Sequence, residues 1–311
     1  MLHEVHITTL LKESRLIEGD INFSPINDGA SGAVVLLCNN QYVVKYAHSS
    51  IIDTAIMNQF RYEYAFYEQY ARHLDFLPEV VFQTANDDEL LLVFRKYEAI
   101  SPERWDSALQ QQAMEICARI NALDCVAYSN PSSQKSESER GQYTLMKSYE
   151  NWHNLHNKFP AQLNASVLKE MYDNFYKIEE YAEGLLIPNT FCHGDFAGGN
   201  FLLDGTRLLV CDWQYTHIGK GIGAVAYFCD RGIDLGWAID RDSLIACYSE
   251  ELREKTGVMV TIDTLTQYAK ASTWLLAFRY WAEYLQDSNA KRVAGIYTGI
   301  VEKYIALQKY I

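Results

Sequence analysis

The sequence predicts an α+β fold of two lobes: a small antiparallel β-sheet with one helix, followed by a larger, mainly helical lobe. Two observations lead to this prediction. Short apolar runs bounded by polar turns dominate the first hundred residues, whereas apolar residues at helical spacing dominate the rest. The 311 residues are also enough for two such lobes. We expect an N-terminal lobe over residues 1–97 and a C-terminal lobe over residues 98–311.

The N-terminal lobe is predicted to contain five strands and one helix. The Asn39-Asn40 pair between two apolar runs is typical of a hairpin turn, and Asn86-Asp87-Asp88 has the composition of a second turn. Apolar side chains recur at helical spacing between these hairpins. The predicted strands are 21–26, 33–38, 41–46, 80–84 and 90–95, and the predicted helix is 55–74.

The C-terminal lobe is predicted to be largely helical, because its apolar residues recur every three or four positions. The polar stretch 129–141 is expected to form a mobile loop. Short strands interrupt the helices between residues 191 and 215. The predicted helices are 107–123, 145–159, 165–183, 223–231, 242–255, 262–287 and 291–310.

Composition narrows the range of partners. The net charge of −13, with no cluster of Lys and Arg, argues against binding to nucleic acid. An acidic surface could attract a cationic small molecule, although solubility explains the charge equally well. No apolar run approaches the roughly 18 residues of a membrane helix. The seven cysteines include no C-x-x-C pair, and the N-terminus lacks a basic region followed by an apolar one, so we expect a cytoplasmic protein.

Polar residues are concentrated in the stretch FCHGDFAGGNFLLDGTRLLVCDWQY, which begins at residue 191. Phosphoryl transfer needs a carboxylate that orients the attacking hydroxyl, and oxygen ligands for Mg²⁺. Asp195, Asn200 and Asp212 meet these needs by type. Asp204-Gly205 marks a hairpin turn, and a four-residue loop there places Asp212 opposite Gly199 and beside Asn200.

Two features of the N-terminal lobe fit a nucleotide. The turn Gly29-Ala30-Ser31-Gly32 could bring backbone N–H groups close to phosphates, although most such turns have no ligand. Lys45 is the one lysine of its predicted strand and lies between apolar neighbours. Its side chain either lies on a solvent-facing side of the strand or directs its ammonium at the phosphates of a nucleotide. A directed ammonium would need a carboxylate from the following helix, where Glu63 and Glu68 are the candidates.

The segment HGDFAGGN resembles the H-G-D-x-x-x-x-N catalytic loop of the aminoglycoside phosphotransferase and choline kinase superfamily, and VCDWQY resembles its second metal-binding motif. The resemblance covers about residues 20–235 and implies a bilobal protein-kinase-like fold. It implies that Asp195 is the catalytic base, that Asn200 and Asp212 are Mg²⁺ ligands, and that His193 supports the loop. It also implies that Lys45 contacts the ATP phosphates and pairs with Glu63 rather than Glu68. The glycine turn of Gly29, Ser31 and Gly32 would then contact the nucleotide.

One position departs from the family pattern. Members of the family commonly have an aspartate about a dozen residues after the metal-binding Asp, where it is expected to brace the catalytic loop. This chain has Ala224 at that place. Asp230, a few residues later, is the candidate for a substitute.

The resemblance implies a small-molecule acceptor with a hydroxyl group, and ATP or alternatively GTP as donor. Our first hypothesis is an aminoglycoside-type antibiotic; a kinase of choline, an amino alcohol or a sugar is the alternative. A nucleotide-binding protein without turnover is a third hypothesis. We expect a monomer or a homodimer.

The aromatic residues of the helix 262–287 are expected to be mostly core. The residues that could contact a cationic acceptor are Trp274, Phe278, Tyr280, Trp281, Glu283, Tyr284, Asp234 and Asp287.

Overall fold

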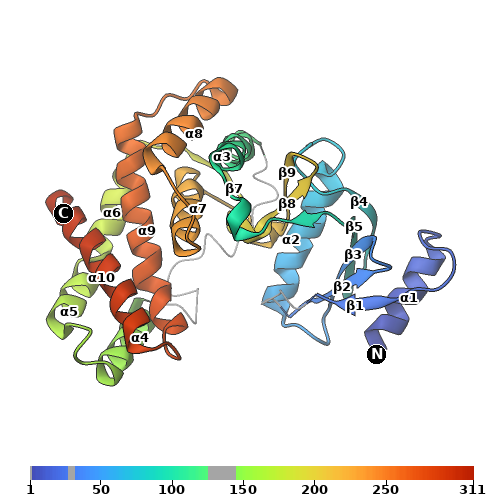
Figure 1. Ribbon diagram of the computed structural model, residues 1–311, viewed down its shortest axis with the longest axis horizontal. Coiled ribbons are helices and arrows are strands. Elements are labelled where there is room, and N and C mark those ends of the chain that lie inside the picture. The colour runs from blue at the N-terminus through green and yellow to red at the C-terminus, as the bar shows by residue number, and fades with distance from the viewer. Residues whose placement is uncertain (1, 27–31, 125–144) are drawn as a thin grey trace. The chain divides into compact units, whose positions relative to one another are not determined.

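A computed structural model describes residues 2–26, 32–124 and 145–311 (Figure 1). The residues form two compact units. The first consists of residues 2–26, 32–105 and 193–216, and the second of residues 106–124, 145–192 and 217–311. The lobe boundary at residues 97 and 98 stays a prediction. The predicted loop 129–141 lies outside the described residues.

The first unit contains an antiparallel sheet of five strands in the order β1-β2-β3-β5-β4. This confirms the predicted small antiparallel sheet. The pairs β2–β3 and β4–β5 are the two predicted hairpins, and β3 lies at the centre. The strands are β1 (Phe23–Pro25), β2 (Val34–Cys38), β3 (Tyr42–His48), β4 (Val80–Ala85) and β5 (Glu89–Arg95).

One face of this sheet packs against α1 (Leu2–Glu13), a helix that was not among the predicted elements. Its segment is rich in β-branched residues, which are poor helix formers. Tertiary packing decides the outcome, because Ile7 and Leu11 are fully buried against Val44 and Val93 of the sheet. The i, i+4 spacing of Ile7 and Leu11 was the signal in the sequence.

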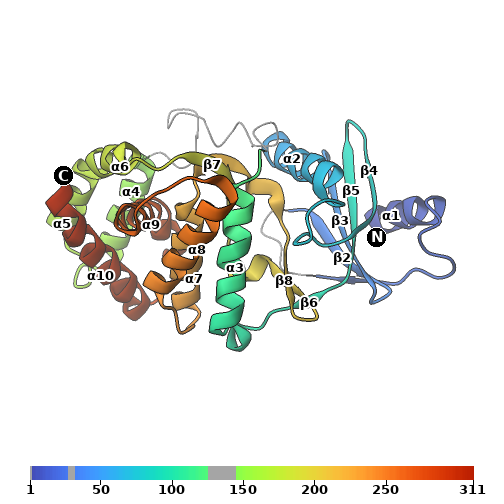
Figure 2. The same ribbon diagram turned by 90° about the horizontal axis from the view of Figure 1, so that it is seen from above.

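The opposite face packs against the predicted helix, α2 (Thr54–Tyr70), as Figures 1 and 2 both show. The helix begins after Asp53, whose side chain accepts a hydrogen bond from the Ile56 N–H at 2.9 Å. Its buried Met57 packs with Ala47 of β3. Because successive strand residues point to opposite faces, Lys45 lies on the same face as Ala47, toward α2.

A second sheet of the first unit carries the polar stretch noted in the sequence. Its order is β6-β8-β9, with strands β6 (Glu98–Ala99), β8 (Phe201–Asp204) and β9 (Arg207–Val210). Phe201 pairs with Val210 and Asp204 with Arg207. This is the predicted register, in which Gly199 is the counterpart of Asp212.

The second unit is mainly helical, as predicted, and α9 is its central element. This helix contacts α4, α6, α7, α8 and α10 (Figure 1). The helices are α3 (Ser107–Asn121), α4 (Leu145–Lys158), α5 (Ala165–Asp173), α6 (Phe175–Gly184), α7 (Ile222–Asp234), α8 (Arg241–Thr256), α9 (Ile262–Tyr284) and α10 (Ala290–Leu307). Strands β7 (Asn189–Cys192) and β10 (His217–Lys220) form an antiparallel pair. Among the described residues, no helix combines the length and apolar character needed to cross a membrane.

The prediction of one continuous helix over 165–183 was wrong, because Asn174 separates α5 from α6. Its backbone leaves the helical region, with φ −98° and ψ 0°. Its side-chain Nδ2 donates to the Tyr304 hydroxyl of α10 at 2.7 Å. The break between the two helices therefore coincides with a contact to a residue 130 positions away. The local sequence pattern does not predict such a break.

Glu89 of β5 links the sheet to α1 and makes stability depend on pH. It accepts hydrogen bonds from the Tyr46 hydroxyl at 2.8 Å and from His6 Nε2 at 2.7 Å. Partial burial opposes the charge, but the hydrogen bonds outweigh it and hold the pKa of Glu89 below its usual 4.5. The stabilisation is therefore complete above about pH 4.5 and is lost as the pH falls through the lower, folded-state pKa.

We expect Glu89→Gln to lower the free energy of unfolding by about 1 kcal/mol at pH 7 and by much less at pH 3. Urea denaturation at both pH values measures the difference. Asp87→Asn, at an exposed position of the same hairpin, is the control and should have a small effect at either pH. Equal losses at pH 7 and pH 3 for Glu89→Gln would contradict the assignment.

Candidate active site

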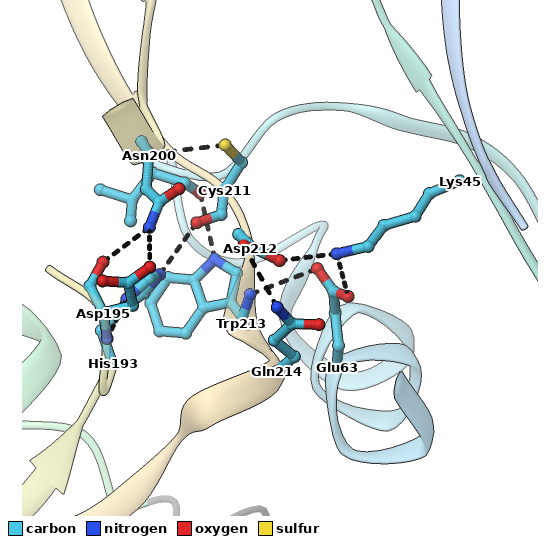
Figure 3. A network of polar contacts seen from close by, with 10 residues as sticks. Lys45, Glu63, His193, Asp195, Asn200, Cys211, Asp212, Trp213 and Gln214 are labelled. Atoms are coloured by element: carbon cyan, nitrogen blue, oxygen red, sulfur yellow. Dashed lines mark hydrogen bonds and ion pairs between the residues drawn. The ribbon is translucent and has the colours of Figure 1, made fainter. Parts of the chain in front are cut away.

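An ion-pair network joins three segments of the first unit that are distant in sequence (Figure 3). Lys45 Nζ of β3 lies 2.7 Å from Glu63 Oε2 of α2 and 2.6 Å from Asp212 Oδ1, just after β9. Glu63 is 1% exposed. Glu68, the other candidate, is exposed to solvent. The structure therefore pairs Lys45 with Glu63.

The two carboxylates keep Lys45 charged. Burial by itself would lower the pKa of Lys45, but the charges of Glu63 and Asp212 outweigh burial and raise the pKa above its usual 10.5. The ammonium also lies 4.8 Å from the centre of the Phe60 ring. A fixed positive charge is therefore present at this point at neutral pH.

Asp212 reaches Lys45 because its backbone turns sharply. Its φ of 67° and ψ of 63° are left-handed, a conformation that Asp adopts more readily than most residues. The turn also brings the Trp213 N–H within 3.2 Å of Glu63 Oε1 and stacks the indole on Phe66 of α2, with ring centres 4.1 Å apart. The Asp212 backbone thus fixes α2 and the end of β9 to each other.

The predicted catalytic loop is held by hydrogen bonds among its own residues and with the end of β9. The Asp195 N–H donates to His193 Nδ1 at 3.3 Å, which leaves the ring hydrogen on Nε2, where it donates to the Cys211 carbonyl at 2.9 Å. His193 is 1% exposed. His193 therefore links the backbone of Asp195 to that of Cys211, and its supporting role in the loop stays a prediction.

Asn200 completes the loop. Its Nδ2 donates to the backbone carbonyl of Asp195 at 2.7 Å and to Asp195 Oδ2 at 2.9 Å. The Cys211 N–H donates to the Asn200 carbonyl at 3.0 Å, which continues the hairpin register by one pair. Figure 3 shows Asp195 and Asn200 on one side of Asp212, with Lys45 and Glu63 on the other.

The remaining oxygens of Asn200 and Asp212 fit a magnesium ion. Within the described part of the chain, Asn200 Oδ1 accepts no hydrogen bond, and Asp212 Oδ2 accepts only a long one, from Gln214 Nε2 at 3.4 Å. No group of three or more His, Cys, Asp or Glu among the described residues could hold a metal. A pair of oxygen ligands is what Mg²⁺ takes from a protein when phosphates and water supply the rest.

The structure describes one residue of the predicted glycine turn, Gly32. Gly29 and Ser31 lie outside the described residues. Gly32 is exposed and has a φ of +74°, a conformation that favours glycine. The predicted contact of this turn with a nucleotide stays a prediction.

Asp230, the candidate substitute for the missing acid, forms ion pairs within the second unit. Its carboxylate contacts Arg241 of α8 and Lys303 of α10, the latter at 2.7 Å. These contacts hold α7 against two helices of the second unit. Ala224 lies in the first turn of α7, where its N–H donates to the Gly221 carbonyl at 3.0 Å.

Two residues of the site were missed in the sequence. Gln214 is 3% exposed and touches Asp212; its position two residues after Asp212, the predicted metal ligand, was the available signal. Gly194 has a φ of +91°, and a Cβ there would lie 1.9 Å from the Tyr215 carbonyl oxygen. Only glycine fits between His193 and Asp195.

We expect Gly194→Ala to destabilise the protein by about 1–3 kcal/mol, because it forces both a strained φ and a clash with backbone. Gly199→Ala in the same loop is the matched control, since its Cβ would meet nothing within 4 Å and its φ is not positive. Thermal unfolding of both variants measures the difference. Equal melting temperatures would contradict the close approach of Gly194 to Tyr215.

Comparison with known proteins places the chain in a family. A model of a phosphotransferase enzyme family matches residues 22–242, which is more than half of the chain. No curated protein sequence matches significantly.

Solved structures share the fold at low sequence identity. A GDP complex of aminoglycoside 2'-phosphotransferase-IIIa superimposes with a TM-score of 0.62 at 13% identity, covering 97% of this chain and 98% of that chain. A choline kinase from Cryptosporidium parvum Iowa II gives 0.63 at 11% identity, covering 98% and 96%. A streptomycin-ATP complex of APH(2")-IIa gives 0.59 at 16% identity, covering 96% and 97%. The protein therefore has the protein-kinase-like fold that these enzymes share, and it belongs to the phosphotransferase enzyme family.

Proposed function

We propose that this protein transfers the γ-phosphoryl group of ATP, with Mg²⁺, to a hydroxyl of a small molecule of the aminoglycoside type. One observation carries the proposal: Lys45, Glu63 and Asp212 form one partly buried network, and Asn200 joins Asp195 to the same hairpin. These are the groups that phosphoryl transfer needs. The solved neighbours include complexes with ATP, ADP and GDP, so GTP is the alternative donor.

Asp195 is the proposed catalytic base. Asn200 donates to Asp195 Oδ2 at 2.9 Å and fixes the plane of the carboxylate. The second oxygen, Oδ1, would accept the proton of the acceptor hydroxyl as that hydroxyl attacks the phosphorus. The side chain is half-buried, so its charge acts through less water than at an open surface.

Asn200 and Asp212 would hold the metal through Oδ1 and a carboxylate oxygen, and a bound Mg²⁺ would neutralise charge on the β- and γ-phosphates. Lys45 would then donate to phosphate oxygens while Glu63 keeps its ammonium in place. Lys45 donates to Asp212 in this structure. Phosphate oxygens are an equivalent acceptor for that hydrogen bond.

The acceptor is proposed from charge and from the neighbours. The net charge of −13 favours a polycationic acceptor. Structures with streptomycin and with gentamicin are among the neighbours.

A choline-type acceptor is the second candidate. Tyr280 and Trp281 of α9 are half-buried and Tyr284 is 69% exposed, so their rings are not all committed to the core. Trp274 and Phe278 are fully buried and belong to the core, as expected. Aromatic rings near an acid such as Glu283 suit a quaternary ammonium group. Turnover itself is supported over simple nucleotide binding, because every group that the chemistry requires is present.

We expect Asp195→Asn to lower the turnover rate by about 10²- to 10⁴-fold, because the amide keeps the shape and the hydrogen bond from Asn200 but accepts no proton. Affinity for Mg·ATP should stay within about threefold. Release of ADP with a panel of aminoglycosides, choline, ethanolamine and sugars measures turnover.

Asp204→Asn is the matched control, because Asp204 is an exposed carboxylate at the turn of the same hairpin. It should leave the rate unchanged. A wild-type rate in Asp195→Asn would show that another group is the base, and no ADP release with any acceptor would favour the binding-only alternative.

We expect ATP with Mg²⁺ at about 100 times its Kd to raise the melting temperature by several degrees, because binding to the folded state alone contributes about 2.7 kcal/mol. The shift should largely disappear in Asp212→Asn and with EDTA in place of Mg²⁺. It should persist in Asp204→Asn. An undiminished shift in Asp212→Asn would remove that residue from the metal site.

A further inference from the structure

A buried asparagine lies where the chain runs from β7 into the catalytic loop. Asn121, the last residue of α3, is 4% exposed. Its Nδ2 donates to the Phe191 carbonyl of β7 at 2.7 Å, with a longer contact to Cys192 Sγ at 3.9 Å. Phe191 precedes His193 by two residues. This side-chain amide therefore holds the strand end that leads into the loop, in addition to the pairing of β7 with β10.

Donors on its other side fix the orientation of this amide. Asn121 Oδ1 accepts from the Tyr248 hydroxyl of α8 at 2.9 Å and from the Cys117 thiol at 3.7 Å. Burial raises the pKa of Tyr248 well above its usual 10, so this hydroxyl remains a donor at neutral pH. The site thus presents an acceptor on one side and donors on the other. An amide in one orientation satisfies both, whereas a carboxylate would face the Phe191 carbonyl with an acceptor.

The backbone comes unusually close to this amide at Gly221, between β10 and α7. A Cβ there would lie 2.1 Å from Asn121 Oδ1 and 2.7 Å from the Tyr248 hydroxyl. The φ of −53° is open to any residue. Glycine is therefore needed for space rather than for conformation. Segments of α3, β7, α8 and the β10–α7 junction meet at one polar contact in the second unit.

Strand β7 needs such an anchor. In the part of the chain that the structure describes, its one strand partner is β10. Beyond that pairing, the Asn121 side chain donates to the Phe191 carbonyl of the strand, and a buried backbone carbonyl needs such a hydrogen-bond partner. The acid expected to brace the loop is replaced by Ala224, and Asp230 is engaged by Arg241 and Lys303.

We propose that Asn121 is a positioning residue for phosphoryl transfer, which holds the Phe191 carbonyl and thereby sets where the catalytic loop begins. The proposal rests on the proposed role of Asp195 as the base. Asn121 acts through β7 and belongs to neither the nucleotide site nor the metal site. Its loss should therefore lower the rate of the chemical step and leave nucleotide affinity nearly unchanged.

Asn121→Asp tests this against a matched control on the same helix. Gln110 is 3% exposed, and its Nε2 donates to the Ala238 carbonyl at 3.0 Å. Gln110→Glu therefore makes the same amide-to-carboxylate change at a different backbone carbonyl. Both variants should lower the melting temperature. Only Asn121→Asp should lower kcat, by about 10- to 100-fold, with the Kd for Mg·ATP within about threefold.

Hydrogen exchange gives a readout that needs no turnover. Asn121→Asp should speed amide exchange over residues 189–197, and Gln110→Glu should not. Tyr248→Phe should give a smaller change in the same direction, and it decides the question if Asn121→Asp does not fold.

Unchanged exchange over 189–197 in the folded variant would overturn the proposal, as would an equal fall of kcat in Gln110→Glu. If the wild-type protein phosphorylates no acceptor, the proposed function fails. The exchange result then still decides whether Asn121 holds the strand.

Discussion

The buried charge of Lys45 is the constraint on which the first unit depends. An ammonium taken out of water is costly unless carboxylates surround it with good geometry, and removing one partner of such a pair typically costs 3–5 kcal/mol. Glu63 and Asp212 provide that geometry at 2.7 and 2.6 Å. The central strand, α2 and the hairpin that ends at Asp212 must therefore come together for the unit to be stable. Because these three segments also carry residues of the candidate active site, the same ion pairs bring that site together.

The predicted catalytic loop is held by hydrogen bonds within it and by contacts of the strand ahead of it. Within the loop, His193 connects the Asp195 N–H to the Cys211 carbonyl, and Asn200 connects two oxygens of Asp195. Ahead of it, β7 is held in the second unit by its pairing with β10 and by Asn121. Most of these are hydrogen bonds from a side chain to backbone, so they fix the path of the chain and leave carboxylate oxygens for chemistry.

Glycine has two separate uses around this loop. Gly194 has a positive φ and also lies against the backbone of Tyr215, so both conformation and space exclude a side chain. Gly221 has an ordinary φ and is needed only because Asn121 and Tyr248 lie so close. In each case the absence of a Cβ allows two parts of the chain to approach each other closely near the loop.

The sequence alone determined what depends on neighbouring residues. The two-residue period of the strands and the Asp204-Gly205 turn set the hairpin register, so the placement of Asp212 opposite Gly199 followed from local geometry. Tertiary structure decided the rest: α1 forms because Ile7 and Leu11 are buried, and α5 ends where Asn174 meets Tyr304. The partner of Lys45 and the anchor of β7 were likewise settled by packing, because each joins side chains or backbone at least 18 residues apart, which no local pattern encodes.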